Sequence, residues 1–266
     1  MLKSSGYITF HGNLQKNVQS QSVEGNIYEL WIEVPDIAKK AMPGQFVSIF
    51  LNDKSRLLPR PISICSVSSD KTGLRLVYRV TGKGSGTEFL STMPRGAKID
   101  LLGPAGNGFP LDSTDTVLIG GGIGIPPLLE LMKRLKGRRR AVLGYKGGSP
   151  FLKDEFEVYG RVYTASDDGS IGVKGTVIDA VLKNEIDLNH ATVMACGPLP
   201  MLRALKEYCT LYDIKCYVSL EERMACSIGA CLACVCNTVE KDSHSCVNNA
   251  RVCKDGPVFP AEEVVL

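Results

Sequence analysis

Six cysteines crowd into the last part of the chain, and their spacing constrains its fold more than any other feature. They are Cys226, Cys231, Cys234, Cys236, Cys246 and Cys253. The first three follow the pattern Cys-x4-Cys-x2-Cys, which is the plant-type spacing for a [2Fe–2S] cluster. The residues between these cysteines are mostly small, so a short loop can wrap closely around a cluster. The spacing therefore predicts a segment organised around metal rather than around an apolar core.

The fourth cluster ligand is not fixed by the spacing. Cys246 and Cys253 both lie downstream of Cys234 and compete for this place. A zinc site is the alternative to an iron–sulfur cluster, although the paired Cys-x2-Cys knuckles of zinc modules are missing. Cys236 follows a predicted ligand by two residues, and we expect it to be a small buried apolar side chain.

Composition narrows the classes of protein to which the chain can belong. The net charge of +3 is too balanced for a chain whose main partner is nucleic acid. No run of 18 or more apolar residues could span a membrane, and residues 1–5 lack the apolar region of a signal peptide. We therefore expect a cytoplasmic protein, in which the ten cysteines stay reduced and serve metal binding rather than disulfides.

The first part of the chain is predicted to be an antiparallel β-barrel. Apolar and polar residues alternate over 27–34, and less strictly over 45–51 and 74–80. Glycine and proline punctuate these runs at short intervals. Many short strands separated by turns are typical of a barrel or sandwich, and we assign residues 1–111 to this domain.

The pattern then changes to alternating strands and helices. Short apolar runs at 116–119, 140–145 and 191–195 predict buried strands, and helical spacing appears at 127–135, 176–182 and 201–211. This alternation predicts βαβ units and a parallel sheet over residues 112–215. Residues 216–266, where the periodicity fails, form the third predicted domain, so the fold class is multidomain.

A glycine-rich turn follows the first of these strands and precedes a helix. It contains Gly120, Gly121, Gly122 and Gly124. Absent side chains and free N–H groups at a helix start make such a turn suitable for binding a diphosphate. The acidic ribose ligand expected about 20 residues later is absent, and Lys146 lies where a 2′-phosphate could bind. The choice between NAD and NADP therefore stays open.

Two further motifs lie at the ends of predicted strands. Cys196-Gly197-Pro198 joins a strand to a helix, where it would face the ligand crevice of a parallel sheet. Arg60-Pro61-Ile62-Ser63 ends a strand of the barrel. Its arginine can bind a phosphate with two nitrogens, and its serine hydroxyl can reach the edge of a flavin ring.

Residues suited to acid–base catalysis form no visible pattern, so no catalytic group is expected in this chain. His11, His190 and His244 are predicted to be ordinary surface residues. Glu221 and Glu222 directly precede the cysteine loop. We expect both to be solvated surface acids, and the alternative is that one of them faces a bound flavin.

The order of these motifs resembles the ferredoxin–NADP reductase superfamily and, more narrowly, the family of electron-transfer subunits of type B dihydroorotate dehydrogenases. The resemblance covers essentially the whole chain and is most specific at 219–236 and 251–259. It implies an FAD-binding barrel at 1–111, an NAD-binding α/β domain at 112–215 and a [2Fe–2S] domain at 216–266. In the family, the cysteine before Asp-Gly-Pro-Val-Phe is the fourth ligand, which corresponds here to Cys253.

The resemblance also implies individual cofactor-binding residues. Those that match the family's flavin motifs are Arg60, Pro61, Ile62, Ser63, Val77, Tyr78, Arg79, Gly86 and Thr87. Those that match its pyridine-nucleotide side are Gly120, Gly121, Gly122, Gly124, Cys196, Gly197 and Pro198. The loop at 82–87 is longer than the usual form of the family. Either Gly84-Ser85 or Gly86-Thr87 could therefore hold the FAD phosphates.

The function implied by the resemblance is electron transfer. FAD would exchange hydride with exchangeable NAD and pass single electrons through the cluster to or from FMN on a dihydroorotate-oxidising partner subunit, with two copies of each subunit. The pathway implied is pyrimidine biosynthesis. The alternatives are a reductase that serves a ferredoxin, a sulfite reductase or a hydrogenase, and a redox sensor that uses the cluster as a switch.

Overall fold

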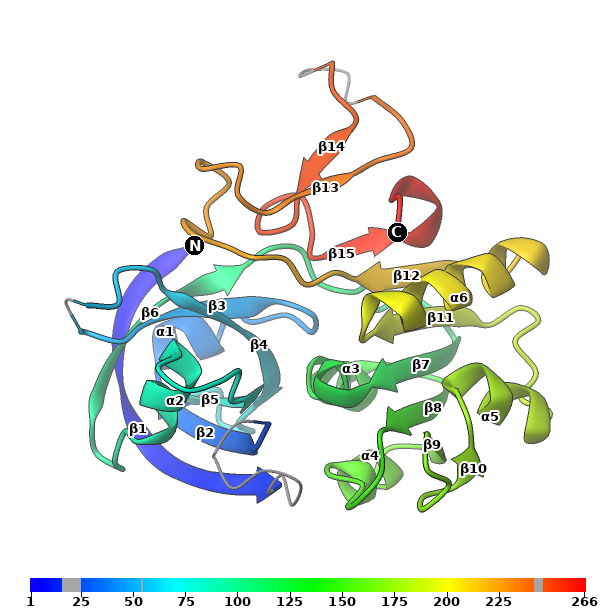
Figure 1. Ribbon diagram of the computed structural model, residues 1–266, viewed down its shortest axis with the longest axis horizontal. Coiled ribbons are helices and arrows are strands. Elements are labelled where there is room, and N and C mark those ends of the chain that lie inside the picture. The colour runs from blue at the N-terminus through cyan, green and yellow to red at the C-terminus, as the bar shows by residue number, and fades with distance from the viewer. Residues whose placement is uncertain (16–24, 54, 242–245) are drawn as a thin grey trace.

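The computed structural model describes residues 1–15, 25–53, 55–241 and 246–266. Figure 1 shows a barrel in blue to cyan beside a sheet in green to yellow, with an orange-red segment above both. No helix of the described residues is long and apolar enough to cross a membrane. His244 lies outside the described residues, so its expected surface position stays a prediction.

The first part is a closed six-stranded antiparallel barrel with the strand order β1-β2-β5-β4-β3-β6. Its strands are β1 (Leu2–Gln15), β2 (Ile27–Glu33), β3 (Phe46–Phe50), β4 (Arg60–Val67), β5 (Gly73–Arg79) and β6 (Lys98–Ala105). Two short helices, α1 (Pro35–Ala38) and α2 (Gly86–Ser91), connect them. Alternate side chains such as Leu30, Ile32 and Leu76 fill the barrel. The predicted antiparallel barrel is confirmed.

The second part is a seven-stranded sheet with the order β10-β9-β8-β7-β11-β12-β15. Its strands are β7 (Asp115–Gly121), β8 (Arg138–Tyr145), β9 (Arg161–Ser166), β10 (Val173–Lys174), β11 (Thr192–Cys196), β12 (Cys216–Ser219) and β15 (Val258–Pro260). Its helices are α3 (Pro127–Arg134), α4 (Lys153–Glu157), α5 (Val177–Lys183) and α6 (Leu199–Leu211), with one-turn η1 (Gly122–Gly124) after β7. Every pairing is parallel except that of β12 with β15.

The chain reverses its direction of travel across this sheet between β7 and β11. Strands β8, β9 and β10 extend the sheet on one side of β7, and β11, β12 and β15 extend it on the other. The register places Gly120, at the end of β7, beside Cys196, at the end of β11. Ligands of open parallel sheets bind at such a switch point, outside the carboxyl ends of the strands.

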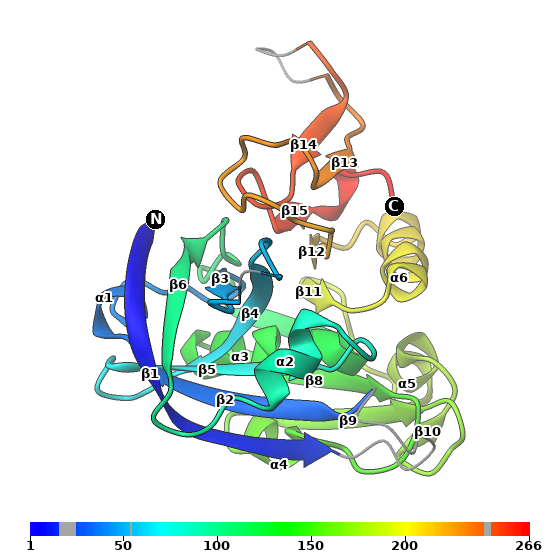
Figure 2. The ribbon, with the colours of Figure 1, turned by 60° about the vertical axis from the view of Figure 1, so that its left-hand side comes forward.

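The third part is built around a two-stranded hairpin, β13 (Val235–Asn237) with β14 (Asn249–Arg251), followed by β15 and the one-turn helix η2 (Ala261–Glu263). In Figures 1 and 2 the hairpin and the loop before it lie over the junction of the barrel and the sheet. The sheet itself continues past residue 215, because β12 and β15 both belong to it. The domain boundaries proposed from the sequence stay predictions.

The structure also contains elements that the sequence patterns did not indicate. Strand β1 was not predicted, because most of its side chains are exposed or half-buried and the apolar alternation is weak. Helix α2 was not predicted either, since its six residues are too few for a helical period to be visible. His11, expected on the surface, is half-buried: its two ring nitrogens lie 2.8 Å from the Tyr78 hydroxyl and from the Met93 carbonyl oxygen.

Candidate functional site

A cavity of about 580 Å³ opens at the switch point of the sheet. The glycine turn and the Gly197-Pro198 segment form its floor. A Cβ atom at Gly121 would lie 2.6 Å from the Met201 sulfur, and one at Gly124 would overlap the Cys196 carbonyl oxygen. These glycines are therefore required by the close packing of the two turns, which leaves the cavity open above them.

Arg79 connects the barrel to this cavity. It ends β5, yet its guanidinium lies beside Gly122, where an added Cβ would be 3.2 Å from one of its nitrogens. The backbone of the glycine turn, residues 121–124, lines the cavity beside Arg79, and its N–H groups together with the guanidinium favour an anion there. A dinucleotide diphosphate is the ligand suited to this combination.

Glu221 is exposed, as expected for a surface acid, and it also lines this cavity. Arg79 and Pro198 line the cavity together with it. Burial between these walls raises the pKa of Glu221, and the charge of Arg79 only partly opposes this effect. Glu222 is exposed, as expected.

The far end of the cavity contains the acidic group that the sequence did not reveal. Asp167 follows β9 and lines the cavity together with Lys146, which follows β8. The Asp167 N–H donates to the Tyr145 carbonyl at 3.2 Å, which fixes this residue at the sheet edge. Sequence reasoning missed Asp167 because β9 was not predicted, and the residue comes later than the position of the usual acidic ribose ligand.

The residues with flavin-like motifs meet at the start of β4. Arg60 lies across Gly86, and a Cβ at this glycine would overlap the Arg60 guanidinium. Gly86 is the first residue of α2, so its N–H belongs to the free amides at the start of that helix. A guanidinium and a helix start that face one small space are suited to bind a phosphate group.

The hydroxyls of the loop before α2 are largely engaged within the protein. Ser85 caps the helix by accepting the Glu88 N–H at 3.1 Å. The Thr87 hydroxyl accepts the Thr81 N–H at 3.0 Å. Gly84 has a φ of 75° and open space around it, whereas Gly86 lies beneath Arg60. These contacts favour Gly86-Thr87 over Gly84-Ser85 as the phosphate-binding pair.

The remaining flavin-motif residues divide between the two faces of the barrel wall. Residues Arg60–Ser63 are half-buried, whereas the next three residues of β4 are fully buried. Ile62 packs against the barrel interior, and Tyr78 points into it and stacks on Tyr28, with ring centroids 6.0 Å apart. The side chain of Val77 lies on the opposite face of β5 from that of Tyr78. Only the backbone of Tyr78 is thus available to a ligand outside the barrel.

The cysteines of the third part form two contacting pairs. The Cys231 N–H donates to the Cys226 sulfur at 3.4 Å, and the Cys253 N–H donates to the Cys234 sulfur at 3.5 Å. Among the described residues, no three His, Cys, Asp or Glu side chains form a group that could hold one metal ion. Two pairs of thiolates suit a [2Fe–2S] cluster, in which each iron takes two protein ligands. Cys246 is exposed and belongs to neither pair.

The surroundings shift the pKa values of Cys226 and Cys253 in opposite directions. Partial burial raises the pKa of Cys226, but the N–H groups of Ile228, Cys231 and Ala230 outweigh it and lower the pKa to about 6. Burial and the neighbouring Cys234 sulfur raise the pKa of Cys253 to about 12. The loop therefore presents one ready thiolate, which is the ligand form that iron requires.

One hydrogen bond ties this loop to the barrel. The Ser48 hydroxyl on β3 donates to the Ser227 hydroxyl at 2.6 Å. Phe46, two residues earlier on β3, belongs to the same apolar cluster as Cys234 and Cys253. The outer face of β3 is therefore the surface on which the cysteine loop rests.

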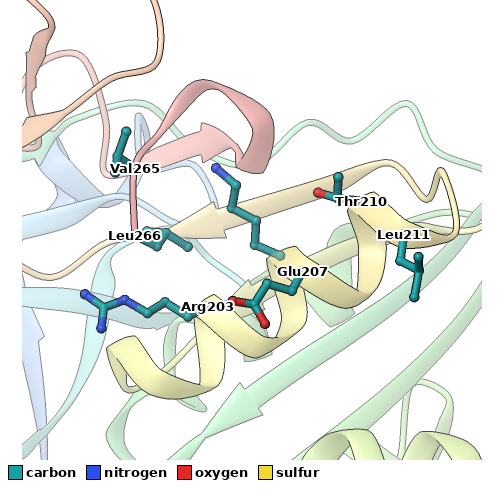
Figure 3. Close-up of a pocket in the computed structure, with 7 residues that line it drawn as sticks. Arg203, Glu207, Thr210, Leu211, Val265 and Leu266 are labelled. Carbon is teal, nitrogen blue, oxygen red and sulfur yellow. The ribbon is translucent and has the colours of Figure 1, made fainter.

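A second hollow, of about 530 Å³, lies between α6 and the final residues, away from these sites. Figure 3 shows Arg203 and Glu207 on the helix, facing Val265 and Leu266. None of the site residues expected from the sequence lines it. The cavity at the switch point is thus the one that collects the predicted nucleotide-binding residues.

Two family models match the chain. The oxidoreductase FAD-binding domain matches residues 14–109, which correspond to most of the barrel. The iron–sulfur cluster binding domain of dihydroorotate dehydrogenase B matches residues 221–265. The second match supports iron–sulfur chemistry over the zinc alternative.

Curated relatives match nearly the whole chain. The dihydroorotate dehydrogenase B (NAD⁺) electron transfer subunits of Bacillus cereus strains B4264 and G9842 are each 44% identical over 259 residues, which cover 94% of this chain and 96% of each relative. The subunit of that name from Bacillus anthracis strain CDC 684 is 43% identical over the same shares.

Solved structures share the fold. One described as an NADH-dependent reduced ferredoxin–NADP oxidoreductase has a TM-score of 0.81 and 28% identity, and the match covers 98% of this chain and 89% of that chain. The ferredoxin–NADP⁺ reductase from Neisseria gonorrhoeae has a TM-score of 0.59 and 17% identity, covering 80% of this chain and 91% of that chain, which is evidence for the fold alone.

Proposed function

The chain belongs to the family of electron-transfer subunits of dihydroorotate dehydrogenase B, and on that basis we propose how its three sites cooperate. It is an oxidoreductase subunit with sites for FAD, an iron–sulfur cluster and NAD, and its role belongs to pyrimidine biosynthesis. We propose that the barrel stands between the other two sites and relays electrons from one to the other.

The observation that carries this proposal is that the barrel wall contacts both other sites. Arg79, at the end of β5, reaches the glycine turn of the nucleotide cavity. Ser48, on β3, holds the cysteine loop. Strand β4, with the flavin motif, lies between β3 and β5 in the barrel. A flavin bound along β4 would thus have the nucleotide on one side and the cluster on the other.

The residues of the two nucleotide sites bind and orient their ligands. When bound, FAD exchanges a hydride with nicotinamide and passes electrons singly, and a [2Fe–2S] cluster carries one electron at a time. Arg60 and the start of α2 would bind the FAD diphosphate, and the close packing of Arg60 on Gly86 supports this proposal. Arg79 and the backbone of the glycine turn, residues 121–124, would bind the NAD diphosphate, and Gly197 and Pro198 line the same cavity.

The cysteine pairs would hold the cluster, with Cys226 and Cys231 on one iron and Cys234 and Cys253 on the other. The N–H groups of Ala230 and Gly229 lie 3.3 Å from the Cys226 sulfur and 3.1 Å from the Cys253 sulfur. Such hydrogen bonds stabilise negative charge on the sulfurs and tune the potential of a bound cluster.

A catalytic partner subunit is implied by the family, because its members are the electron-transfer component of a larger enzyme. We propose that this partner carries FMN and oxidises dihydroorotate, and that the complex contains two copies of each subunit. We also propose a cytoplasmic location, which is supported by the ten cysteines, none of which forms a disulfide.

The test is to isolate the tagged chain anaerobically from its host and to assay dihydroorotate-dependent reduction of NAD⁺. We expect a coloured complex with a co-purifying flavin subunit and activity that is lost when that subunit is removed. A protein that NADH reduces but that shows no such activity would support a reductase for another acceptor. A protein that contains the cluster and a flavin, but whose flavin is not reduced by NADH, would support the redox sensor instead.

A further inference from the structure

Ser48 occupies an unusual position for a polar residue. Its side chain is fully buried, with 0% exposure, in the middle of β3. Val47 and Ile49 point into the barrel core, so Ser48 faces outward, on the same side as Phe46. Its cross-strand neighbour is Pro61 of the flavin motif. Ser48 therefore lies beside the flavin strand β4 and faces the segment that packs on the outer face of the barrel.

The segment that packs on this outer face is the first turn of the cysteine loop. Ser227, directly after Cys226, is 1% exposed and accepts the Ser48 hydrogen bond at 2.6 Å. Its φ of 58° is in the left-handed region, which residues with side chains rarely adopt. A strained backbone persists where surrounding contacts determine it, and the buried hydrogen bond to Ser48 supplies such a contact.

A second left-handed residue in the loop provides a comparison. Leu232 has the same φ of 58°, but it is 58% exposed. The loop therefore contains two strained turns, of which the one beside Cys226 is anchored in the protein interior. Ser227 in the anchored turn directly follows Cys226, whose sulfur accepts the N–H groups of Ala230 and Cys231 from the part of the loop next to Leu232.

We propose that the Ser48–Ser227 hydrogen bond is a positioning device that fixes the Cys226 end of the loop against β3, the neighbour of the flavin strand β4, and thereby sets the reduction potential of the bound cluster. The inference rests on the proposed function. Hydrogen bonds to cluster sulfurs favour the reduced, more negative state and so raise the potential. Loss of the anchor would let the turn open, lengthen these bonds and shift the potential downward.

The test uses the intact complex with Ser48→Ala, Ser227→Ala and the double variant. We expect each single variant to lower the potential in an EPR-monitored redox titration and to release iron to a chelator about ten-fold faster, the size of one buried hydrogen bond. The double variant should show the same shift as either single variant, because all three remove the same contact. Additive shifts, or a potential equal to that of the wild type in Ser48→Ala, would overturn the proposal.

Two further variants separate positioning from general stability. Ser227→Gly removes the hydroxyl and also relieves the left-handed strain, so we expect the lowered potential with an unchanged unfolding temperature. A wild-type potential in this variant would show that the hydrogen bond has no role. Ser66→Ala, which removes another buried hydroxyl from β4, is the matched control and should leave the potential unchanged.

The two proposals fail in different ways. A wild-type complex without FAD, without a cluster signal or without dihydroorotate-dependent activity would contradict the proposed function. A fully active complex in which substitution of Ser48 or Ser227 leaves the reduction potential of the cluster unchanged would contradict only the inference drawn from these two residues.

Discussion

The proposed flavin site on β4 and the proposed cluster site in the cysteine loop are stabilised by different interactions, and we call them the flavin seat and the cluster seat. Arg60 projects from a strand that pairs with neighbours on both sides, within a closed barrel that has its own buried core. The cysteine loop contains no regular element between residues 220 and 234, and the hairpin after it has three residues in each strand. The first seat is determined by the backbone ladder, whereas the second depends on a few side-chain anchors and on its ligand.

This difference predicts how each seat responds to damage. In a site built on hydrogen-bonded strands, loss of one side chain removes one interaction with the cofactor and leaves the protein scaffold in place. In a ligand-organised seat, binding energy is folding energy, so loss of one ligand removes both the cluster and the order of the loop. Substitutions in the two seats should therefore differ in kind as well as in size.

The largest effect is expected for Cys253→Ser. We expect loss of the [2Fe–2S] absorbance and EPR signal and of electron transfer to the partner, with FAD retained in the barrel. Cys246→Ser is the matched control, because this exposed cysteine belongs to neither sulfur pair, and it should retain iron at the wild-type level. Iron analysis of the two purified variants decides which cysteine is the fourth ligand, and full iron in Cys253→Ser would refute the assignment.

A graded effect is expected for Arg60→Ala. A charged hydrogen bond to phosphate is worth about 1.5–3 kcal/mol, so the Kd for FAD should rise roughly ten- to one-hundred-fold. The unfolding temperature of the apoprotein should change little, because within the described part of the chain the Arg60 guanidinium donates a hydrogen bond only to the Leu58 carbonyl in the adjoining loop. Arg95→Ala, at an exposed position on the same domain, controls for the loss of charge. Equal flavin retention in the two variants would remove Arg60 from the site.

The sequence predicted those parts of the sites that lie within single short motifs. The cysteine spacing and the glycine turn of Gly120–Gly124 are each contained in a few consecutive residues, so the chemistry they suit can be predicted from the local sequence. Contacts between distant segments were not predictable, because no local pattern encodes them: Ser48 and Ser227 are 179 positions apart. The strand β12 was hidden for a related reason, since four residues that begin with a cysteine show no period.

Alternation along strands also corrects one expectation in detail. Val77, Tyr78 and Arg79 match a flavin motif as a continuous triplet, but consecutive side chains of a strand point to opposite faces. Tyr78 therefore lies in the barrel with His11, and only its neighbours project toward the nucleotide side. A motif read as a string overstates the number of side chains that can touch one ligand.

A smaller effect is expected at the far end of the nucleotide cavity. We infer that the Asp167 carboxylate faces the ribose hydroxyls of NAD and repels the 2′-phosphate of NADP. Asp167→Asn should raise KM for NAD⁺ several-fold and lower it for NADP⁺. Asp168→Asn is the control, because that neighbouring carboxylate is occupied by the Ser170 N–H and hydroxyl. An unchanged ratio of kcat/KM for the two nucleotides in Asp167→Asn would exclude the role.

The smallest effect concerns Glu221, and its sign follows from the direction of its pKa shift. Burial raises the pKa of this carboxyl in the folded protein, so the unfolded state is favoured when the group ionises, and the stability it contributes below pH 4.5 is lost as the pH rises through the folded pKa. Glu221→Gln should therefore raise the unfolding temperature at pH 8 more than at pH 5. Glu222→Gln, at an exposed site outside the cavity, should show no such pH dependence. Equal gains at both pH values would mean that the carboxyl is solvated as freely as its neighbour, and that Glu221 exerts no field on a nucleotide bound beside Arg79.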